Sequence, residues 1–346
     1  MRLIQPESET GQSAAGLSDP ATIRQGLLDA AQTPAAPASV ASEAALLLPV
    51  EVPTPPVPAP PRPIEAPPLP HPRAAQRLQF DANFTRRIIR LIEPLMRVYF
   101  RAELRGAENL PDRQTILVAN HDGGMLPLDG FVLGTGWHQR HGYQKPLHVL
   151  VHDIVLRFAP WLRRVGAVLA DRDNLDAIMD AGESVLVYPG ASRETFRPFW
   201  ERKQITLGNR TGFVKHALLR GVPITPVVSA GVHETFIVLW RGTWLAERLG
   251  FARLFRADVF PIVAGLPFGI WLGAFLPQLP LPAKITVQVL PAIDVRAEAA
   301  QLLGRPLRDE DLDNNEVVDF CFHRIRDTMQ KALDGLYAER RYPVIG

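Results

Sequence analysis

The chain has 346 residues, of which 47% are hydrophobic and 21% charged, and it contains 33 prolines and one cysteine. This composition excludes a collagen, a coiled coil and a disulfide-stabilised scaffold. The 38 Lys and Arg residues against 36 Asp and Glu residues give a net charge of +2, which is too balanced for a protein whose main task is to neutralise nucleic-acid phosphates. We therefore expect no nucleic-acid partner, and we expect folding in the cytosol because Cys321 alone forms no internal disulfide.

The N-terminal region is rich in proline and alanine. About 14 of the prolines lie between Pro34 and Pro72, a composition that favours extended polyproline II and closes no core. The sequence therefore predicts a disordered tail over residues 1–78 and a folded domain over residues 79–346. We interpret the tail as a spacer, with a docking ligand for a proline-binding protein as the alternative. Its first residues lack the pattern of a signal peptide.

The folded domain opens with a predicted basic amphipathic helix, FTRRIIRLIEPLMRVYFRAELR, which Pro94 is expected to kink. At 100° per residue, four arginines share one side of this helix: Arg86, Arg90, Arg97 and Arg101. Four apolar residues lie near the opposite side: Phe84, Leu91, Leu95 and Tyr99. Two interpretations remain open, namely a helix that lies on an anionic membrane surface and a helix that packs on the core with its arginines in water.

Apolar runs of strand length then alternate with helical stretches. The runs are TILVAN, LHVLV, GAVLA, SVLVYP, PITPVV and KITVQVL. This alternation predicts an α/β domain with a mostly parallel sheet flanked by helices. In such sheets, ligands bind at the carboxyl ends of the strands.

One segment departs from this pattern. Residues 259–283 carry no charge and are interrupted by five prolines, from Pro261 to Pro282. So many interruptions argue against a straight membrane-spanning helix, because each one leaves backbone groups unpaired in lipid. The remaining interpretations are an apolar hairpin that dips into one leaflet of a membrane and a buried core segment.

Polar residues that suit catalysis follow the first strand. His121 comes directly after it, and an imidazole is the best general base at neutral pH. Asp129, or alternatively Asp122, is expected to orient this base. Gly123 and Gly124 allow backbone N–H groups to approach a thioester carbonyl or an oxyanion.

Charged residues follow two further strands. Arg193 and Glu194 come after SVLVYP and a Pro-Gly turn, where they offer an anion clamp beside a hydrogen-bond acceptor. Arg172 follows the strand GAVLA. Because His121, Arg172 and Arg193 all come after strands, we expect them to share one edge of the sheet.

Four blocks of the sequence together resemble the glycerolipid acyltransferase superfamily, which includes the 1-acylglycerol-3-phosphate acyltransferases. The likeness is greatest to the branch with diacylglycerol acyltransferase-like YPGG motifs. In chain order the blocks are NHDGGMLPLD at 120–129, GAVLADR at 166–172, YPGASRE at 188–194 and GVPITPV at 221–227.

The resemblance implies roles for single residues. His121 would deprotonate an acceptor hydroxyl, and Asp129 would hold its imidazole. The usual spacing places this Asp at position 126, where the chain has Leu126. Four residues would bind and position the acceptor's head group: Arg172, Gly190, Arg193 and Glu194. Gly190 stands where the FPEGTR form of the third block has glutamate, and Ala191 stands where YPGG has its second glycine.

The activity implied by the resemblance is membrane-associated O-acyl transfer. The donor would be acyl-CoA or acyl-carrier protein as co-substrate, and the acceptor a hydroxyl of a lysophospholipid or glycerol-phosphate lipid, without a further cofactor or a covalent acyl-enzyme. The enzyme would contact the cytoplasmic face of a membrane, peripherally or monotopically. A neutral-lipid ester synthase, which acylates diacylglycerol or a long-chain alcohol, and a non-catalytic lipid-binding protein are the alternatives.

A group of histidines raises the question of a metal site. Five lie within a short stretch: His121, His138, His141, His148 and His152. His148 and His152 flank a strand-like run, where residues four apart share a face but lie too far apart to bind one ion. We therefore predict no metal site.

Overall fold

The computed structural model describes residues 2–4, 78–121, 127–250, 259–273, 279–342 and 344–346. The predicted tail over residues 1–78 lies outside the described residues except for 2–4 and Leu78, so its disorder stays a prediction. The predicted oxyanion residues Gly123 and Gly124, together with Asp122, also lie outside them.

The main sheet has eight strands in the order β1-β2-β11-β7-β3-β6-β4-β5. Their bounds are β1 Arg2–Ile4, β2 Glu103–Arg105, β3 Ile116–Ala119, β4 Leu147–Val151, β5 Ala167–Leu169, β6 Ser184–Val187, β7 Ile224–Ala230 and β11 Thr286–Val289. Every neighbouring pair is parallel except β11 and β7. The predicted α/β class is confirmed, and each of the six apolar runs forms a strand. The edge strand β1 and its neighbour β2 were not predicted, and Glu103–Arg105, which form β2, had been assigned to the end of the basic helix.

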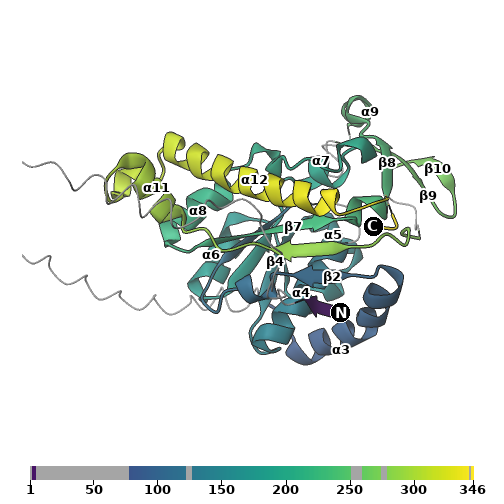
Figure 1. Cartoon of the computed structure of the whole chain (residues 1–346), viewed down its shortest axis with the longest axis horizontal. Coiled ribbons are helices and arrows are strands. Elements are labelled where there is room, and N and C mark those ends of the chain that lie inside the picture. The colour runs from purple at the N-terminus through teal and green to yellow at the C-terminus, as the bar shows by residue number, and fades with distance from the viewer. Residues whose placement is uncertain (1, 5–77, 122–126, 251–258, 274–278, 343) are drawn as a thin grey trace, which may run out of the picture. The chain divides into compact units, whose positions relative to one another are not determined.

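Helices cover both faces of this sheet (Figure 1). Their bounds are α3 Ala82–Pro94, α4 Leu128–His141, α5 Asp153–Phe158, α6 Arg172–Asp180, α7 Ala191–Thr195, α8 Gly212–Arg220, α9 Thr243–Arg248, α11 Val295–Leu303 and α12 Asn315–Ala338. Alternate residues of β3 enter opposite cores, because successive side chains of a strand point to opposite faces. Val118 packs with residues of α8 and α12, whereas Leu117 packs with residues of α4.

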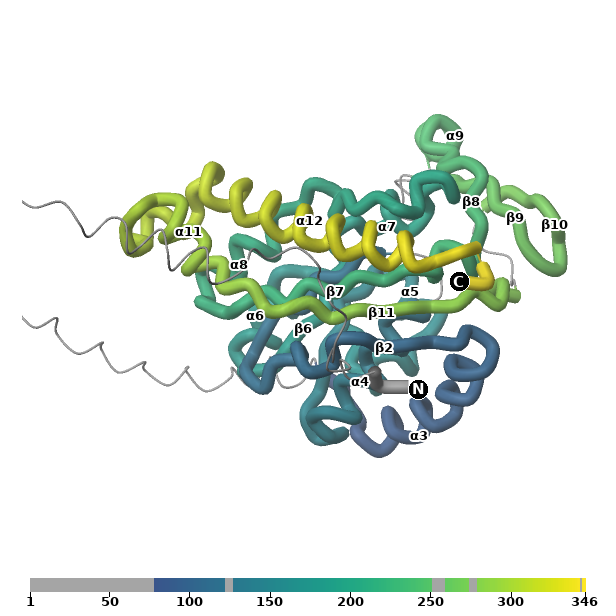
Figure 2. The backbone as a smooth tube through the Cα atoms, viewed as in Figure 1, coloured from purple at the N-terminus to yellow at the C-terminus, as the bar shows by residue number. Residues whose placement is uncertain are grey.

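Two stretches of the apolar segment form strands of a second, antiparallel sheet, and Val259, Val263 and Trp271 of the segment are buried in a small core. This sheet has the order β10-β9-β8, with β8 Ile237–Trp240, β9 Ile262–Gly265 and β10 Gly269–Leu272. It projects from the main body near α9 (Figure 2). Among the helices of the described ranges, none combines the length and apolar character needed to cross a membrane.

The basic helix is present, but the face on which it packs differs from the prediction. Asp81 caps α3, because its carboxylate accepts a hydrogen bond from the Phe84 N–H at 2.9 Å. The helix continues past Pro94 as a π-helical turn, Leu95–Tyr99. The residues that face the core are Thr85, Ile89 and Met96. They lie on a third face, between the arginines and the leucines, because each residue advances 100°. Leu91 and Leu95 are therefore exposed.

Candidate active site

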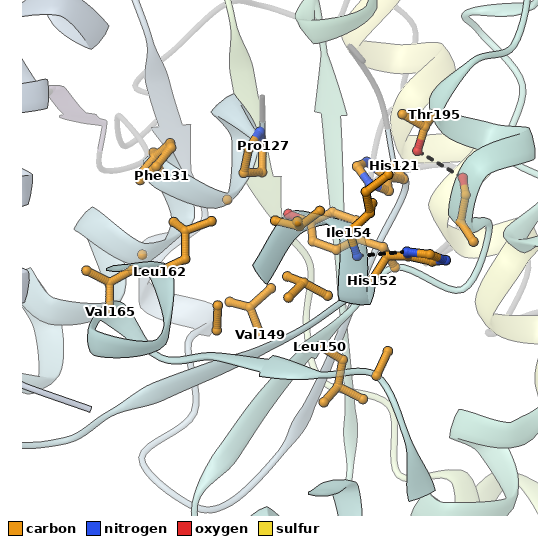
Figure 3. A pocket seen from close by; sticks show the side chains of 18 of the residues that line it. His121, Pro127, Phe131, Val149, Leu150, His152, Ile154, Leu162, Val165 and Thr195 are labelled. Carbon is orange, nitrogen blue, oxygen red and sulfur yellow. Dashed lines mark hydrogen bonds between the residues drawn. The ribbon is translucent and has the colours of Figure 1, made fainter. Parts of the chain in front are cut away.

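The carboxyl ends of three neighbouring parallel strands bring together the residues of one site. His121 follows β3, Tyr188 follows β6 and His152 follows β4. All three line a cavity of about 510 Å³, which is within the usual size of a small-ligand site. Figure 3 shows His121, His152 and Thr195 toward one end of the cavity and Phe131, Leu162 and Val165 toward the other. The lining is mainly apolar, which suits a hydrocarbon chain.

Asn120 fixes the position of His121 by joining the end of β3 to β7. Its side-chain amide donates to the Ser229 carbonyl at 3.1 Å and accepts from the Ser229 N–H at 2.8 Å. Both residues are buried. These two hydrogen bonds therefore fix the backbone position at which His121 follows β3.

His121 is placed to act as a neutral base. Its ring lies 4.6 Å from the ring of Tyr188, between centroids, and its Nδ1 is buried without a hydrogen-bond partner among the described residues. Burial, and to a smaller extent the charge of Arg197, lower the pKa of His121 from 6.5 to about 4. The imidazole is therefore uncharged at neutral pH, which is the form that accepts a proton.

Glu194 supports His121 from beneath. One carboxylate oxygen accepts a hydrogen bond from the His121 backbone N–H at 3.3 Å, and the other accepts from the backbone N–H groups of Thr206 at 3.1 Å and Leu207 at 3.4 Å. The buried guanidinium of Arg197 lies 3.5 Å from the same carboxylate. Because Glu194 is buried, occupied by these groups and absent from the cavity lining, the geometry gives it a positioning role. Its predicted contact with a head group stays a prediction.

The turn after β6 holds Glu194 in this place. A Cβ added at Gly190 would lie 1.9 Å from Glu194 Oε2 and 2.4 Å from its Cβ, so only glycine fits beneath the folded-back side chain. Gly190 therefore packs against the Glu194 side chain, and this is the contact that the structure shows for Gly190. The next residue, Ala191, has φ +44°, in the left-handed region that favours glycine.

Asp129 lies buried in the first turn of α4. A carboxylate is favourable there because the helix N-terminus carries partial positive charge. The next residue, Gly130, approaches Tyr188 closely: a Cβ built on it would lie 3.1 Å from the Tyr188 hydroxyl. The first turn of α4 therefore packs on the tyrosine against which His121 lies. The role of Asp129 as partner of His121 stays a prediction.

The two predicted arginines follow strands but do not line the cavity. Arg172 begins α6 and lies 3.8 Å from Asp176 of the same helix. Its strand, β5, stands three places from β3 in the sheet order, which separates it from His121. Arg193 is exposed on α7. Arg210 lines the cavity instead, and no strand or turn pattern in the sequence marked it.

Two of the histidines considered for a metal site have other partners. His148 Nε2 lies 2.5 Å from Glu183 Oε2, and His138 stacks between Phe80 and Tyr143. Within the part of the chain that the structure describes, no three His, Cys, Asp or Glu side chains come together in a way that would hold a metal ion.

Comparison with known proteins identifies the family of this chain. A family model described as diacylglycerol acyltransferase matches residues 71–248. An uncharacterized protein of Mycobacterium leprae is 30% identical over 266 residues, which cover 76% of this chain and 67% of that protein. The mouse protein named DGAT1/2-independent enzyme synthesizing storage lipids is 27% identical, over 54% of this chain and 55% of its own length. Bovine diacylglycerol O-acyltransferase 2 is 25% identical, over 40% and 44%.

Among solved structures, the 1-acyl-sn-glycerophosphate acyltransferase PlsC from Thermotoga maritima is similar with a TM-score of 0.42 and 16% identity, over 77% of this chain and 87% of that chain.

The protein is thus an acyltransferase of lipid metabolism, whose substrates are an acyl donor and a lipid acceptor. More particularly, the chain belongs to the diacylglycerol acyltransferase family. The resemblance to glycerolipid acyltransferases that the four blocks indicated is confirmed.

Two substitutions in the turn after β6, one from glycine to alanine and one from alanine to glycine, test the geometry of that turn. Gly190→Ala forces Glu194 aside, and we expect a loss of about 1–3 kcal/mol in the free energy of unfolding. Ala191→Gly relieves the positive φ and should raise that free energy by about 0.5–1 kcal/mol. Urea unfolding of both variants measures the two effects. Equal stability of Gly190→Ala and the wild type would contradict the close packing of Glu194 on this glycine.

Proposed function

We propose that this enzyme transfers a fatty acyl group from a thioester, acyl-CoA or acyl-carrier protein, to a hydroxyl of a glycerolipid. The observation that carries the proposal is the neutral imidazole of His121 in the wall of an apolar cavity. A hydrocarbon chain buried there gains about 0.8 kcal/mol per methylene group, so a long acyl chain supplies ample binding energy.

In this mechanism, His121 removes the proton from the acceptor hydroxyl as its oxygen attacks the thioester carbonyl. A C–O bond forms, the C–S bond breaks, and the thiolate leaves and takes up a proton. Asp129 would orient the imidazole and stabilise its protonated form. Backbone N–H groups of Gly123 and Gly124 would stabilise the oxyanion. The thioester carries its own leaving group, so these steps need neither a metal ion nor a covalent acyl-enzyme.

A neutral acceptor such as diacylglycerol is the first candidate. The names of the bovine and mouse relatives point to neutral lipids, and Arg172 and Arg193 do not line the cavity. A lysophospholipid or glycerol-phosphate lipid is the second candidate, because Arg210 lines the cavity and would pair with a phosphate. Both acceptors are membrane lipids. The proposal therefore includes peripheral or monotopic attachment to the cytoplasmic face of a membrane.

Release of free CoA from acyl-CoA tests this function. We expect release that depends on diacylglycerol, or on a lysophospholipid if the second acceptor class is correct. His121→Ala should lower the rate about 100- to 10,000-fold, because the general base is lost. His323→Ala, which changes an exposed histidine of α12, is the matched control and should keep the wild-type rate. Wild-type turnover by His121→Ala would refute the proposed base.

The pH dependence of kcat/KM reports the protonation of His121. The base acts only when neutral, so kcat/KM should stay level as the pH falls from neutral and then decline through about pH 4, the lowered pKa of His121. Return of each sample to neutral pH before a second assay separates protonation from unfolding. An acid limb at the ordinary imidazole pKa of about 6.5 would show that burial does not control this group.

A pair of substitutions identifies the partner of the base. Asp129→Asn should lower kcat on the order of 100- to 10,000-fold, because an amide neither stabilises the imidazolium nor selects the same tautomer. Asp122→Asn should keep most of the activity. Steady-state kinetics at neutral pH compare the two variants, and circular dichroism checks that both are folded. The reverse pattern would assign the partnership to Asp122.

A further inference from the structure

We infer that one end of the molecule is a surface that docks on anionic phospholipid membranes and delivers lipid directly from the bilayer to His121. The docking surface consists of the outward face of the β9–β10 hairpin and the exposed side of residues 87–98 in α3 and the π-helical turn. The inference rests on the proposed function, since it concerns how that substrate reaches the site. Three independent features of the described residues carry it.

The first feature is that the hairpin is apolar on both faces. Trp271 pairs with Val263 and packs inward in a small core with Phe196 and Phe236. The outward side chains of β10 are nevertheless Ile270 and Leu272, which are 69% and 59% exposed. An antiparallel sheet with one face in water ordinarily alternates apolar and polar residues. The outward face of this hairpin is therefore suited to lipid.

The second feature is the exposed side of α3, where apolar and basic residues lie together. Leu91 and Val98 are 75% and 70% exposed, and three arginines beside them are also exposed: Arg87, Arg90 and Arg97. Apolar side chains flanked by arginines are typical of a helix that lies in the head-group region of a membrane. The positive charge selects anionic lipids.

The two elements are held together as one surface. The Tyr99 hydroxyl donates to the Pro280 carbonyl at 2.7 Å, and Arg101 Nη2 donates to the Pro282 carbonyl at 2.9 Å. These bonds join the end of the π-helical turn to the segment that follows the hairpin. In Figure 1 both α3 and β9–β10 lie toward the same end of the folded part, and α11 lies toward the opposite end.

The third feature is that α3 and the segment that leads into the hairpin also line the cavity. Ile88 and Ile89 of α3 contribute to its wall, and so do the three residues that lead into β9, 259–261. The cavity thus extends from His121 to the inner side of α3 and to the segment that leads into the hairpin. We therefore expect a lipid that leaves the bilayer between α3 and the hairpin to enter this cavity.

The depth of docking follows from the backbone. β10 is an edge strand of its sheet, so one row of its N–H and C=O groups has no strand partner within the described part of the chain. Such groups are costly in hydrocarbon but are satisfied among head groups and water. Trp240 and Trp244, both exposed near the hairpin, are side chains that favour this interfacial depth.

Vesicle flotation of the full chain tests the inference. The probes are vesicles of phosphatidylcholine alone and vesicles that also contain phosphatidylglycerol. We expect wild-type protein to float with the anionic vesicles, and the variant Ile270→Glu/Leu272→Glu to lose at least about tenfold in binding. Arg90→Gln and Arg97→Gln should each weaken binding to the anionic vesicles about fivefold. Leu302→Glu, an exposed apolar residue of α11, is the matched control and should bind as the wild type does.

An assay with a short-chain acceptor dispersed in water separates this inference from the proposed function. The hairpin variant should keep wild-type CoA release with that acceptor and lose it with acceptor held in vesicles. Absence of CoA release by the wild type would refute the proposed function. The flotation experiment would still test the docking surface, because it measures binding and not turnover. Undiminished flotation of the hairpin variant, or equal loss by Leu302→Glu, would overturn the inference.

Discussion

The buried carboxylate of Glu194 is the contact on which the geometry of this active site depends. It accepts backbone hydrogen bonds from His121 and from residues 206–207, so it connects the end of β3 to the segment that leads into α8. A carboxylate is costly to bury, and its charge is balanced here by Arg197 at 3.5 Å. Loss of either partner would leave an uncompensated buried charge next to the backbone of His121.

This arrangement also sets the electrostatics of His121. Arg197 stabilises Glu194 and at the same time disfavours a proton on the imidazole, and burial acts in the same direction. Burial is the larger cause of the lowered pKa of His121 and Arg197 the smaller one, while Glu194 holds the His121 backbone. The required glycine at position 190 has the same origin, because the Glu194 side chain folds back over that residue.

The chain presents apolar side chains in two different settings. In the cavity they are enclosed by α3, α4, β4 and α5, where they suit a hydrocarbon chain. On the hairpin and on α3 they face outward. α3 takes part in both settings, because Ile88 and Ile89 line the cavity whereas Leu91 faces outward, and the cavity-lining segment 259–261 leads into β9.

Local sequence patterns were enough to predict the fold class, the six apolar strands, and the position of His121 and Glu194 after strands of a parallel sheet. These features depend on local periodicity and on the order of segments along the chain, both of which are visible in the sequence. The order of strands in space decided the rest: β5 lies three places from β3, so Arg172 stands apart from His121 although both follow strands. Tertiary packing likewise buried Glu194 beneath the base, brought Arg210 to the cavity and turned Leu91 outward. Each outcome depends on contacts between residues distant in the chain, and no local pattern records those contacts.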